Sequence, residues 1–343
     1  MRTADTRRPA WNTLALLGIW LFLAFPFRPT IAAPAGLDIS GLIQAAEHDF
    51  NSGNYPVAIS TLESAVAQNA VSAEAHYWLG RSYYELRDFD NAVVHAEKSV
   101  ALDARNSLYH QWLARAYGGK ADRDKSFFLA KKVKKELEDA VRLNPSNIPA
   151  RSDLEDFCLS APWIVGGNKD EAHDQVDAIS ALDAVEGHLA RASFDLQALK
   201  KTDAAESEYR QVLAARPSRV EPYLEVIAFF QKENKVADMS AAIEAAAQSN
   251  PKDPRITYFR AVALVLSGTE PAHAEEYLKS YIASTPERSD WPSHAAAREW
   301  LGRLYETQGK QAEAAEQYRA SLQIDPSRKE ARTQLEKLEK GPN

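Results

Sequence analysis

Cysteine is almost absent from this chain, and glycine and methionine are scarce. The 343 residues contain one cysteine, Cys158, so no disulfide can form within the chain and its core must hold it together. Hydrophobic residues make up 45% and charged residues 26%, which is typical of a packed protein and argues against extensive disorder. Only 14 glycines, together with alanine-rich runs, favour helices over strands.

Motifs for catalysis, metal binding and nucleotide binding are also lacking. The eight histidines are scattered without His-Glu-x-x-His spacing, and His76 and His110 are interpreted as packing or surface residues. Neither a Gly-x-Ser-x-Gly elbow nor a phosphate-binding Gly-x4-Gly-Lys-Ser/Thr loop is present. We therefore predict no catalytic residue, no cofactor and no metal site, and a protein that is not an enzyme.

The charge is divided unevenly along the chain. The formal net charge is −7, and residues 1–35 carry four arginines and one aspartate, or +3, so the remainder carries −10. Phosphate contacts require a basic surface, so this acidic body argues against nucleic-acid binding.

One long apolar run occurs, over residues 14–25. It is uncharged, follows an arginine-rich start and is followed by small residues at 32–36, the pattern of a secretory signal peptide. Twelve helical residues span roughly 18 Å, which is short of a hydrocarbon core of about 30 Å. We predict a signal peptide over residues 1–35, cleaved after Ala32 or Ala35, and a periplasmic or secreted protein. The alternative is an inner-membrane anchor through residues 14–25.

A spacing of 34 residues recurs along the rest of the chain. It separates Leu79 from Leu113, Tyr83 from Tyr117, Ala58 from Ala92 and Pro217 from Pro251. The content repeats as well: the stretch His76–Tyr83 is followed by Asp88–Ala92, and Trp300–Tyr305 is followed by Gly309, Ala314, Tyr318 and Pro326. In period and content these stretches resemble the tetratricopeptide repeat (TPR) of bacterial exported proteins.

The resemblance implies an all-α protein, a right-handed α-solenoid of about eight helix hairpins closed by a C-terminal capping helix. Glycine at 80 and 302 lets the two helices of a hairpin approach closely. We place a repeat array over residues 36–328 and a capping helix and tail over 329–343. The individual repeats are placed at residues 39–72, 73–106, 107–147, 148–185, 186–219, 220–253, 254–288 and 295–328.

Two insertions stand out from the period. Residues 160–172 contain an Ala-Pro-Trp-Ile-Val-Gly-Gly stretch, in which we expect Asn168 and Glu171 to form a capping box and Trp163, Ile164 and Val165 to fill a gap between hairpins. A phosphate-cradling loop is the alternative. Residues 287–293 form a loop containing Trp291 and Pro292.

Repeat 3 is basic. Leu129, Val133, Leu137 and Ala140 are spaced as one helix face, opposite a set of lysines at 131, 132, 134 and 135. We interpret this set as a solvated face; the alternative is a dock for an acidic partner or anionic lipid headgroups.

The resemblance also implies a peptide-binding groove, because the first helices of TPR hairpins line a concave surface. It places there Tyr77, Arg81, Tyr84, Gln111 and Arg115 from repeats 2 and 3, and Glu299, Arg303 and Glu306 from repeat 8. Arginine can bind a carboxylate through two hydrogen bonds and tyrosine adds rigid apolar area, so an extended peptide with an acidic group would suit this groove. The family's chaperone-binding clamp is absent, since Ile43 and Glu47 stand in its first two positions.

We predict a non-catalytic scaffold that binds a protein or peptide partner in the cell envelope. The alternative is a structural subunit or assembly factor of an envelope apparatus for secretion or for polysaccharide or wall synthesis. The step from fold to function is by analogy. Expected partners are protein or peptide, with no nucleic acid, and a membrane only if the N-terminal segment is uncleaved.

Overall fold

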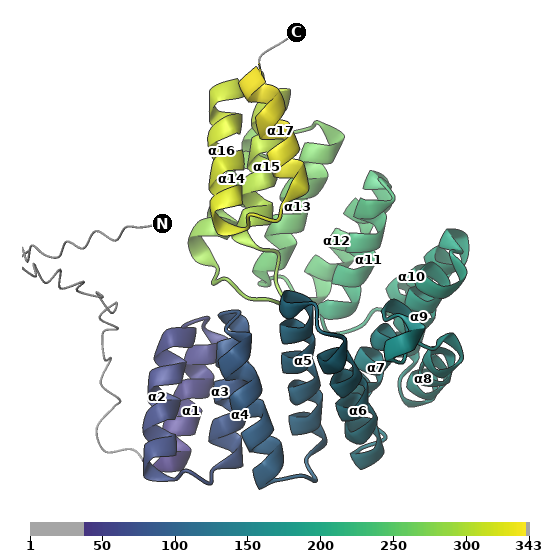
Figure 1. Ribbon diagram of the computed structural model, residues 1–343. Helices are drawn as coiled ribbons and strands as arrows, with labels where there is room; N and C mark the ends of the chain where they lie inside the picture. The colour runs from purple at the N-terminus through teal and green to yellow at the C-terminus, as the bar shows by residue number, and fades with distance from the viewer. Residues whose placement is uncertain (1–37, 341–343) are drawn as a thin grey trace, which may run out of the picture. The chain divides into compact units, whose positions relative to one another are not determined.

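The computed structural model describes residues 38–340 (Figure 1). The predicted signal peptide and its cleavage sites lie outside the described residues. Between residues 38 and 340 the chain is helical, without strands. The helices are α1 (Ile39–Asn51), α2 (Tyr55–Gln68), α3 (Ala73–Glu85), α4 (Phe89–Leu102), α5 (Ser107–Asp124), α6 (Phe127–Leu143), α7 (Ile148–Ser160), η1 (Trp163–Val165), α8 (Lys169–Leu182), α9 (Ala184–Phe194), η2 (Asp195–Leu199), α10 (Thr202–Ala215), α11 (Glu221–Lys232), α12 (Val236–Ser249), α13 (Pro254–Ser267), α14 (Pro271–Ser284), α15 (His294–Thr307), α16 (Gln311–Ile324) and α17 (Lys329–Lys340).

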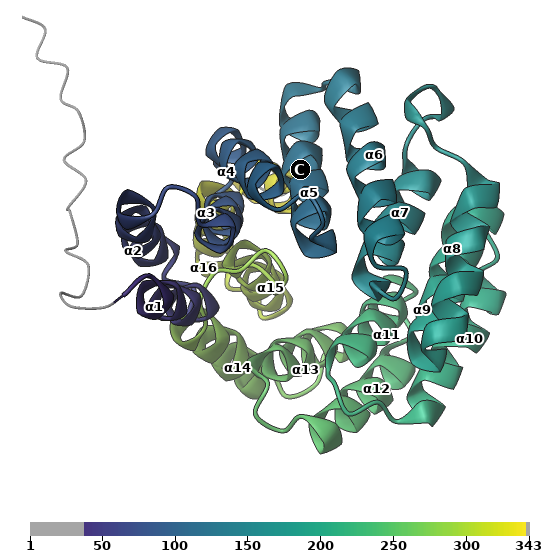
Figure 2. The ribbon, with the colours of Figure 1, turned by 90° about the horizontal axis from the view of Figure 1, so that it is seen from below.

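Consecutive helices pair into eight hairpins, from α1–α2 to α15–α16, followed by α17, which confirms the predicted solenoid. Each hairpin packs against the next. Odd-numbered helices also contact one another along the chain, as in α1 with α3, α3 with α5 and α5 with α7. The odd-numbered helices therefore line the inner side of the array and the even-numbered helices its outer side (Figure 2). In the part of the chain that the structure describes, no helix combines the length and apolarity that crossing a bilayer requires.

The ends of the helices follow local sequence signals. Side chains such as Asp38, Ser72 and Asp88 accept a hydrogen bond from the first turn of the helix that follows each of them. The second helices of several hairpins end two residues before a proline, for example α10 before Pro217 and α12 before Pro251. A proline has no N–H to continue the helix, so it marks the end of these second helices.

The turn inside a hairpin uses a residue with positive φ. Glycine holds this place at Gly53 (φ 75°) and Gly309 (φ 72°), whereas Arg87 (φ 58°) and Asn234 (φ 55°) hold it in other hairpins. A side chain is therefore tolerated in the left-handed conformation at this position, at a modest free-energy cost. The backbone of the turn alone does not require glycine at 53 and 309.

Close approach within a hairpin depends on small residues. A Cβ added to Gly80 would lie 3.2 Å from the backbone N of Ala96 and 3.3 Å from the carbonyl O of Ala92. In the last hairpin, a Cβ on Gly302 would lie 2.6 Å from the ring of Tyr318. Protein interiors are close-packed, so these contacts leave no room for a side chain.

Tyrosines join the second and the third hairpin to the hairpin before each of them. The hydroxyl of Tyr83 donates to Glu63 at 3.0 Å, and that of Tyr117 donates to Glu97 at 2.5 Å. Both pairs are 20 residues apart, so the bond repeats with the hairpins. The rings of both tyrosines are buried, so they fill the space between neighbouring hairpins.

The insertion at 160–172 differs from the prediction. Val165 is buried, but Trp163 is 83% exposed and Ile164 is 57% exposed, so these two side chains do not fill a gap between hairpins. Asn168 accepts from the backbone N–H of Asp170 and Glu171 as predicted. The reciprocal half of the capping box is absent, because the N–H of Asn168 donates to the carbonyl O of Cys158 and the Glu171 carboxylate binds Lys134.

Candidate functional site

An aromatic and arginine cluster lies on the inner side of α3 and α5. The guanidinium carbon of Arg81 lies 4.4 Å from the ring centroid of Trp112 and 4.5 Å from those of Phe50 and Trp78. The rings of Tyr77 and Tyr84 contact Trp112 edge-on, with centroids 6.4 and 5.9 Å from it. We name Tyr77, Arg81, Tyr84 and Trp112 the Trp112 cluster. Trp112 was missed in the sequence, although its position between Gln111 and Leu113 on a predicted first helix could have indicated it.

The predicted groove residues Gln111 and Arg115 meet at one carboxylate. Nε and Nη2 of Arg115 donate to the two oxygens of Asp153 on α7 at 2.8 and 3.0 Å, and Nε2 of Gln111 donates to Asp153 at 2.8 Å. The Arg115 guanidinium carbon also lies 4.9 Å from the Trp112 ring centroid. Asp153 therefore already occupies the bidentate donors of Arg115. A carboxylate from a ligand would have to compete with it.

The five predicted groove residues thus lie together, but they differ in exposure. Tyr77 and Gln111 are buried, with 7% and 2% of their surface exposed, so they pack beneath the residues that reach solvent. Arg81, Tyr84 and Arg115 are half-buried and reach solvent. Nη1 of Arg81 donates to the Tyr77 hydroxyl at 3.1 Å, and its buried Nε has no partner among the described residues. Peptide binding by these residues stays a prediction.

The predicted groove residues of repeat 8 bind other side chains of the last hairpin and of the cap. Glu299, buried on α15, binds Nε of Arg328 at 2.7 Å, ahead of the capping helix. Arg303 lies 3.5 Å from Glu330 on α17, and Glu306 accepts from the Tyr318 hydroxyl. These side chains hold the cap and the last hairpin together, so they are engaged within the protein.

Three carboxyl groups with raised pKa values lie further along the inner side, on α7 and α11. Glu155 on α7 is 2% exposed, and its Oε1 has no hydrogen-bond partner among the described residues. Burial, reinforced by the neighbouring Asp156 carboxylate, raises the pKa of Glu155 to about 8. Asp156 and Glu225 reach solvent but are surrounded by protein on the inner side, and this desolvation raises the pKa of both carboxyls. A carboxyl such as Glu155 is neutral at pH 7 because water is excluded from it.

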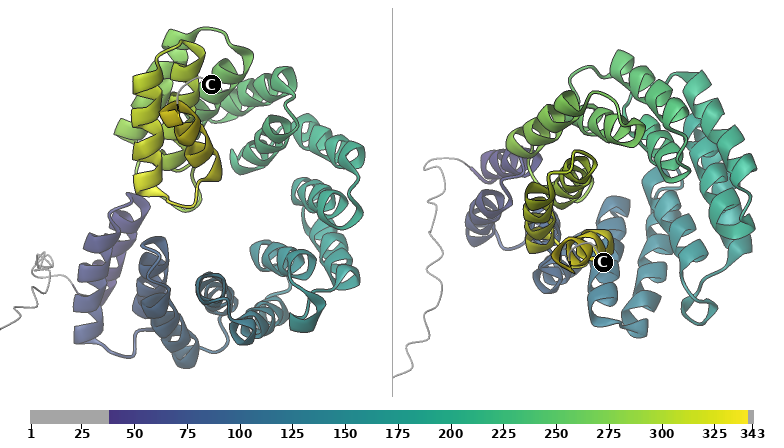
Figure 3. Two further views of the ribbon diagram at one scale, coloured as in Figure 1. Left: turned by 45° about the horizontal axis from the view of Figure 1, so that its top comes forward. Right: turned by 90° about the horizontal axis from the view of Figure 1, so that it is seen from above.

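The connection between α14 and α15 reaches the first two hairpins (Figure 3). Nη1 of Arg288 donates to the carbonyl O of Asn51, at the C-terminal end of α1, at 3.2 Å. The N–H and hydroxyl of Ser289 donate to the Glu85 carboxylate, at the end of α3, at 2.9 and 3.0 Å. Pro286 packs on Gly53. We name these interactions the closing contact, because they join residues more than 200 positions apart in the chain.

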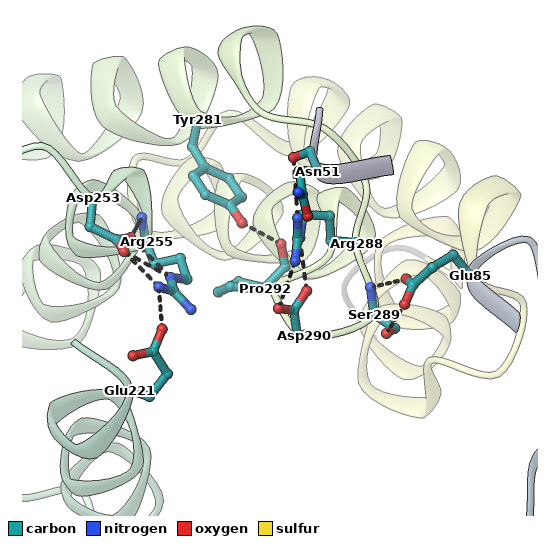
Figure 4. A network of polar contacts seen from close by, with 10 residues as sticks. All are labelled: Asn51, Glu85, Glu221, Asp253, Arg255, Tyr281, Arg288, Ser289, Asp290 and Pro292. Carbon is teal, nitrogen blue, oxygen red and sulfur yellow. Dashed lines mark hydrogen bonds and ion pairs between the residues drawn. The ribbon is translucent and has the colours of Figure 1, made fainter. Parts of the chain in front are cut away.

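The same connection is stiffened from within, as Figure 4 shows. Arg288 also donates to both oxygens of Asp290 at 2.9 and 3.0 Å, and its guanidinium carbon lies 5.4 Å from the Trp291 ring centroid. Tyr281 donates to the carbonyl O of Pro292 at 2.7 Å, and the buried Arg255 lies on the Trp291 ring at 5.3 Å. Arg255 is itself held by Glu221 and Asp253. The insertion is therefore a rigid segment.

An open pocket of about 520 Å³ lies beside the closing contact. It is lined by the turn of the first hairpin, by Glu85 and Leu86, and by residues 283–287. Its lining comes from both ends of the array. Opening of the closing contact would therefore abolish it.

One group of side chains has the composition of a metal site. His110, Glu136 and Asp139 bring potential ligand atoms within 4.8 Å of one another. Nδ1 of His110 lies 2.6 Å from Glu136, and Nε2 lies 3.1 Å from the carbonyl O of Ala104. The bond with Glu136 raises the pKa of His110, which favours the imidazolium that donates to both acceptors. The group fits an ion pair between α5 and α6 better than a metal site.

The helix pairs, their turns and their stacking define an α-solenoid of helix hairpins. The family model of the tetratricopeptide repeat matches residues 43–107 and 274–329, which include the two repeats with the strongest sequence pattern. The chain therefore contains tetratricopeptide repeats in these two stretches. Its fold is that of a protein-interaction scaffold, and proteins with this repeat are in general non-catalytic. No curated protein matches the chain.

Solved structures of TPR proteins are similar to it. A TPR protein of Thermus thermophilus is 21% identical, with 56% of this chain and 98% of that chain covered and a TM-score of 0.46. A TPR protein of Parabacteroides merdae is 12% identical, with 88% and 98% covered and a TM-score of 0.44. The APC/C hetero-tetramer Cut9-Hcn1 gives a TM-score of 0.50 at 12% identity, with 89% of this chain and 57% of that chain covered. At 12% identity the likeness to Cut9-Hcn1 shows the fold alone.

Proposed function

We propose that the protein is an envelope scaffold that binds an extended segment of a partner protein on its inner side, at the Trp112 cluster. The observation that carries this proposal is the arrangement of Arg81 among four aromatic rings, next to half-exposed Tyr84 and Trp112. Aromatic residues and arginine supply most of the binding free energy in protein interfaces. Here they are held in place by buried neighbours.

The ligand is a segment with an acidic group beside an apolar one. Arg81 is half-buried and its guanidinium reaches solvent, so an incoming carboxylate could accept charge-assisted hydrogen bonds from it. An apolar side chain would lie on the exposed parts of Tyr84 and Trp112. Arg115 contributes less, because Asp153 already accepts two of its hydrogen bonds.

Selection from a displayed library of random dodecapeptides tests the proposal. We expect an enriched motif with an acidic residue near an apolar one, and loss of its binding in Arg81→Ala and in Trp112→Ala. The matched control is Arg260→Ala, because Arg260 is bound to Glu244 by two hydrogen bonds, at 3.1 and 3.0 Å, outside the Trp112 cluster. An enriched motif that binds Arg81→Ala as tightly as the unchanged protein would refute the site.

Location in the periplasm or outside the cell is part of the proposal and rests on the arginine-rich start and apolar run of residues 1–35. N-terminal sequencing of the mature protein tests it, and an intact Met1 would favour an anchor through residues 14–25 instead. A stable stoichiometric complex in envelope fractions would favour the alternative role, a subunit or assembly factor of an envelope apparatus.

A further inference from the structure

Two neighbouring connections expose large apolar side chains to solvent. Phe127 and Phe128, at the start of α6, are 67% and 71% exposed. Trp163 and Ile164, in η1 between α7 and α8, are 83% and 57% exposed. We name these four residues the aromatic edge. Exposed apolar residues scattered singly need no explanation, but four large ones on adjacent connections mark an interaction surface.

The two connections lie at the same edge of the array. Helix α6 packs against α7, and η1, which follows α7, also packs against α6. Phe127, Lys131 and Lys134 follow one another at spacings of four and three residues and therefore share one face of α6. Nζ of Lys134 donates to the carbonyl O of Gly166 at 3.0 Å, which joins this face to the connection that carries Trp163. The helical stretch from Phe127 to Lys134 covers about 10 Å.

The exposure of Trp163 is not the result of a loose loop. Val165 next to it is buried, and the N–H of Gly166 donates to the carbonyl O of Trp163 at 3.1 Å. The N–H of Gly167 donates to the carbonyl O of Pro162 at 3.2 Å, and a Cβ on Gly167 would lie 1.9 Å from the carbonyl O of Ala161. The backbone is packed too tightly to turn the tryptophan inward. The backbone of the turn therefore directs the Trp163 side chain to solvent.

Basic side chains surround the aromatic edge. Residues 120–135 carry seven lysines and arginines against two aspartates, in a chain whose net charge is −7. Five of these seven form ion pairs with nearby carboxylates, so the free positive charge comes from the other two. Lys125 and Lys131 are exposed and form no ion pair with any described residue, and Nζ of Lys132 lies 5.6 Å from the Phe128 ring centroid. Basic residues beside exposed tryptophan and phenylalanine are the composition of surfaces that lie in the headgroup region of a membrane.

We propose that the aromatic edge docks on an anionic membrane surface, with Trp163, Ile164 and the two phenylalanines in the headgroup region and Lys125 and Lys131 facing lipid phosphates. The side chains project from two separate turns rather than lining a groove. A fluid interface accepts such projections without matching pockets, whereas a protein partner would need one pocket for each. Lysines near an anionic surface add about 1 kcal/mol each.

Hydrogen exchange of the full chain on lipid vesicles tests the proposal. Vesicles of phosphatidylcholine alone are compared with vesicles containing about 30% phosphatidylglycerol at about 0.1 M salt. We expect slower exchange at residues 126–131 and 162–167 on the anionic vesicles, and recovery of the free rates at about 0.5 M salt because the attraction is screened. The readout is local, so binding through residues 1–37 does not produce it. Unchanged exchange at both segments on anionic vesicles, or equal slowing on neutral ones, would overturn the proposal.

Sedimentation with the same anionic vesicles measures the contribution of each part. We expect the double change Trp163→Ser and Ile164→Ser to lower the partition coefficient on the order of tenfold, since two apolar side chains no longer leave water. The control is Val71→Ser, because Val71 is 68% exposed in the turn before α3. Equal binding by the double variant and the control would contradict the role of η1.

The charge is tested in the same way. Lys125→Glu with Lys131→Glu should lower partitioning by about fivefold or more at about 0.1 M salt and have little effect at about 0.5 M, as expected for lysines that each add about 1 kcal/mol. Lys252→Glu, at an exposed lysine in the turn before α13, is the control. Losses of the same size in both would show only general charge repulsion and would refute a local basic surface. All these positions are exposed, so the circular dichroism spectrum should not change.

Discussion

Replacement of Gly53 by alanine is the sharpest probe of the closing contact. Gly53 has φ 75° and packs on Pro286, and a Cβ added to it would lie 2.2 Å from the Cβ of Pro286. Gly309 holds the same place in the last hairpin with φ 72°, and a Cβ there would meet nothing within 4 Å. Because Arg87 and Asn234 occupy this left-handed position in other hairpins, alanine is sterically possible at both glycines as far as the backbone is concerned. Comparison of Gly53→Ala with Gly309→Ala therefore separates the strain of the left-handed backbone from the steric clash with Pro286.

The magnitudes follow from these contacts. Alanine in the left-handed conformation costs about 1–2 kcal/mol, and this cost is common to both variants. Two carbons attract best at about 3.5–4.0 Å, so a separation of 2.2 Å in the closed form forces the two segments apart by more than about 1 Å. The closing contact has three exposed hydrogen bonds, from Arg288 and Ser289, each worth about 1 kcal/mol net. A movement of this size breaks them, so Gly53→Ala removes the closed form as well as straining the turn.

Distances between spin labels measure the outcome. The labels are placed on cysteines at the exposed positions His48 on α1 and Ser280 on α14, in a Cys158→Ala background. We expect one narrow distance distribution in the unchanged chain and in Gly309→Ala, and a longer, broader one in Gly53→Ala. Both variants should lose about 1–2 kcal/mol of unfolding free energy through the turn itself. An unchanged distribution in Gly53→Ala would show that the two ends of the array do not hold each other.

Three further predictions concern packing and buried charge. Gly302→Ala drives a Cβ into a buried tyrosine ring 2.6 Å away and should lower the melting temperature, whereas Gly118→Ala, where the nearest atom is 4.0 Å away, should raise stability by up to about 1 kcal/mol through helix propensity. Arg328→Ala leaves the buried Glu299 carboxylate unpaired and should cost about 3–5 kcal/mol in a urea titration; an effect below about 1 kcal/mol would contradict this ion pair's role. The pKa of Glu155 is raised to about 8 in the folded state from an ordinary value of 4.5, so the folded state binds the extra proton and stability falls as pH rises between these values. Glu155→Gln should therefore stabilise the protein more at about pH 8 than at about pH 5, and equal effects at both would refute a neutral buried carboxyl.

The regular part of the fold was predictable because each hairpin packs mainly on its sequence neighbours. The 34-residue spacing, the small residue at Gly80 and the prolines after second helices are local consequences of that packing. The inner position of Arg81 and Arg115 followed from the same register. The difference in their hydrogen bonding could not be predicted in the same way. Arg115 is bound by Asp153, and this contact depends on how far α7 is rotated relative to α5. That rotation is set by side-chain volumes between hairpins rather than by the period.

The exposed tryptophan shows a second limit of the pattern. A Trp-Ile-Val run predicts burial on composition, and Val165 follows the rule. Trp163 does not, because the backbone bonds that close the turn and the tight approach of Gly167 to Ala161 fix which way the run faces. Such an orientation is a property of the turn geometry.

The segments inserted into the 34-residue period also explain where this solenoid differs from a regular stack of hairpins. In a solenoid each repeat contacts only its neighbours, so a regular hairpin cannot reach a distant one. A contact between the two ends of the array therefore requires extra chain, and the connection before α15 supplies it through Arg288 and Ser289. The same reasoning applies to the outward Trp163, because a residue within the period is placed on a neighbouring hairpin. Under the two proposals, binding on the inner side belongs to the regular helices, whereas docking is shared between η1 and the start of α6. Closure belongs to the connection before α15, so mutations in these segments should separate the three properties.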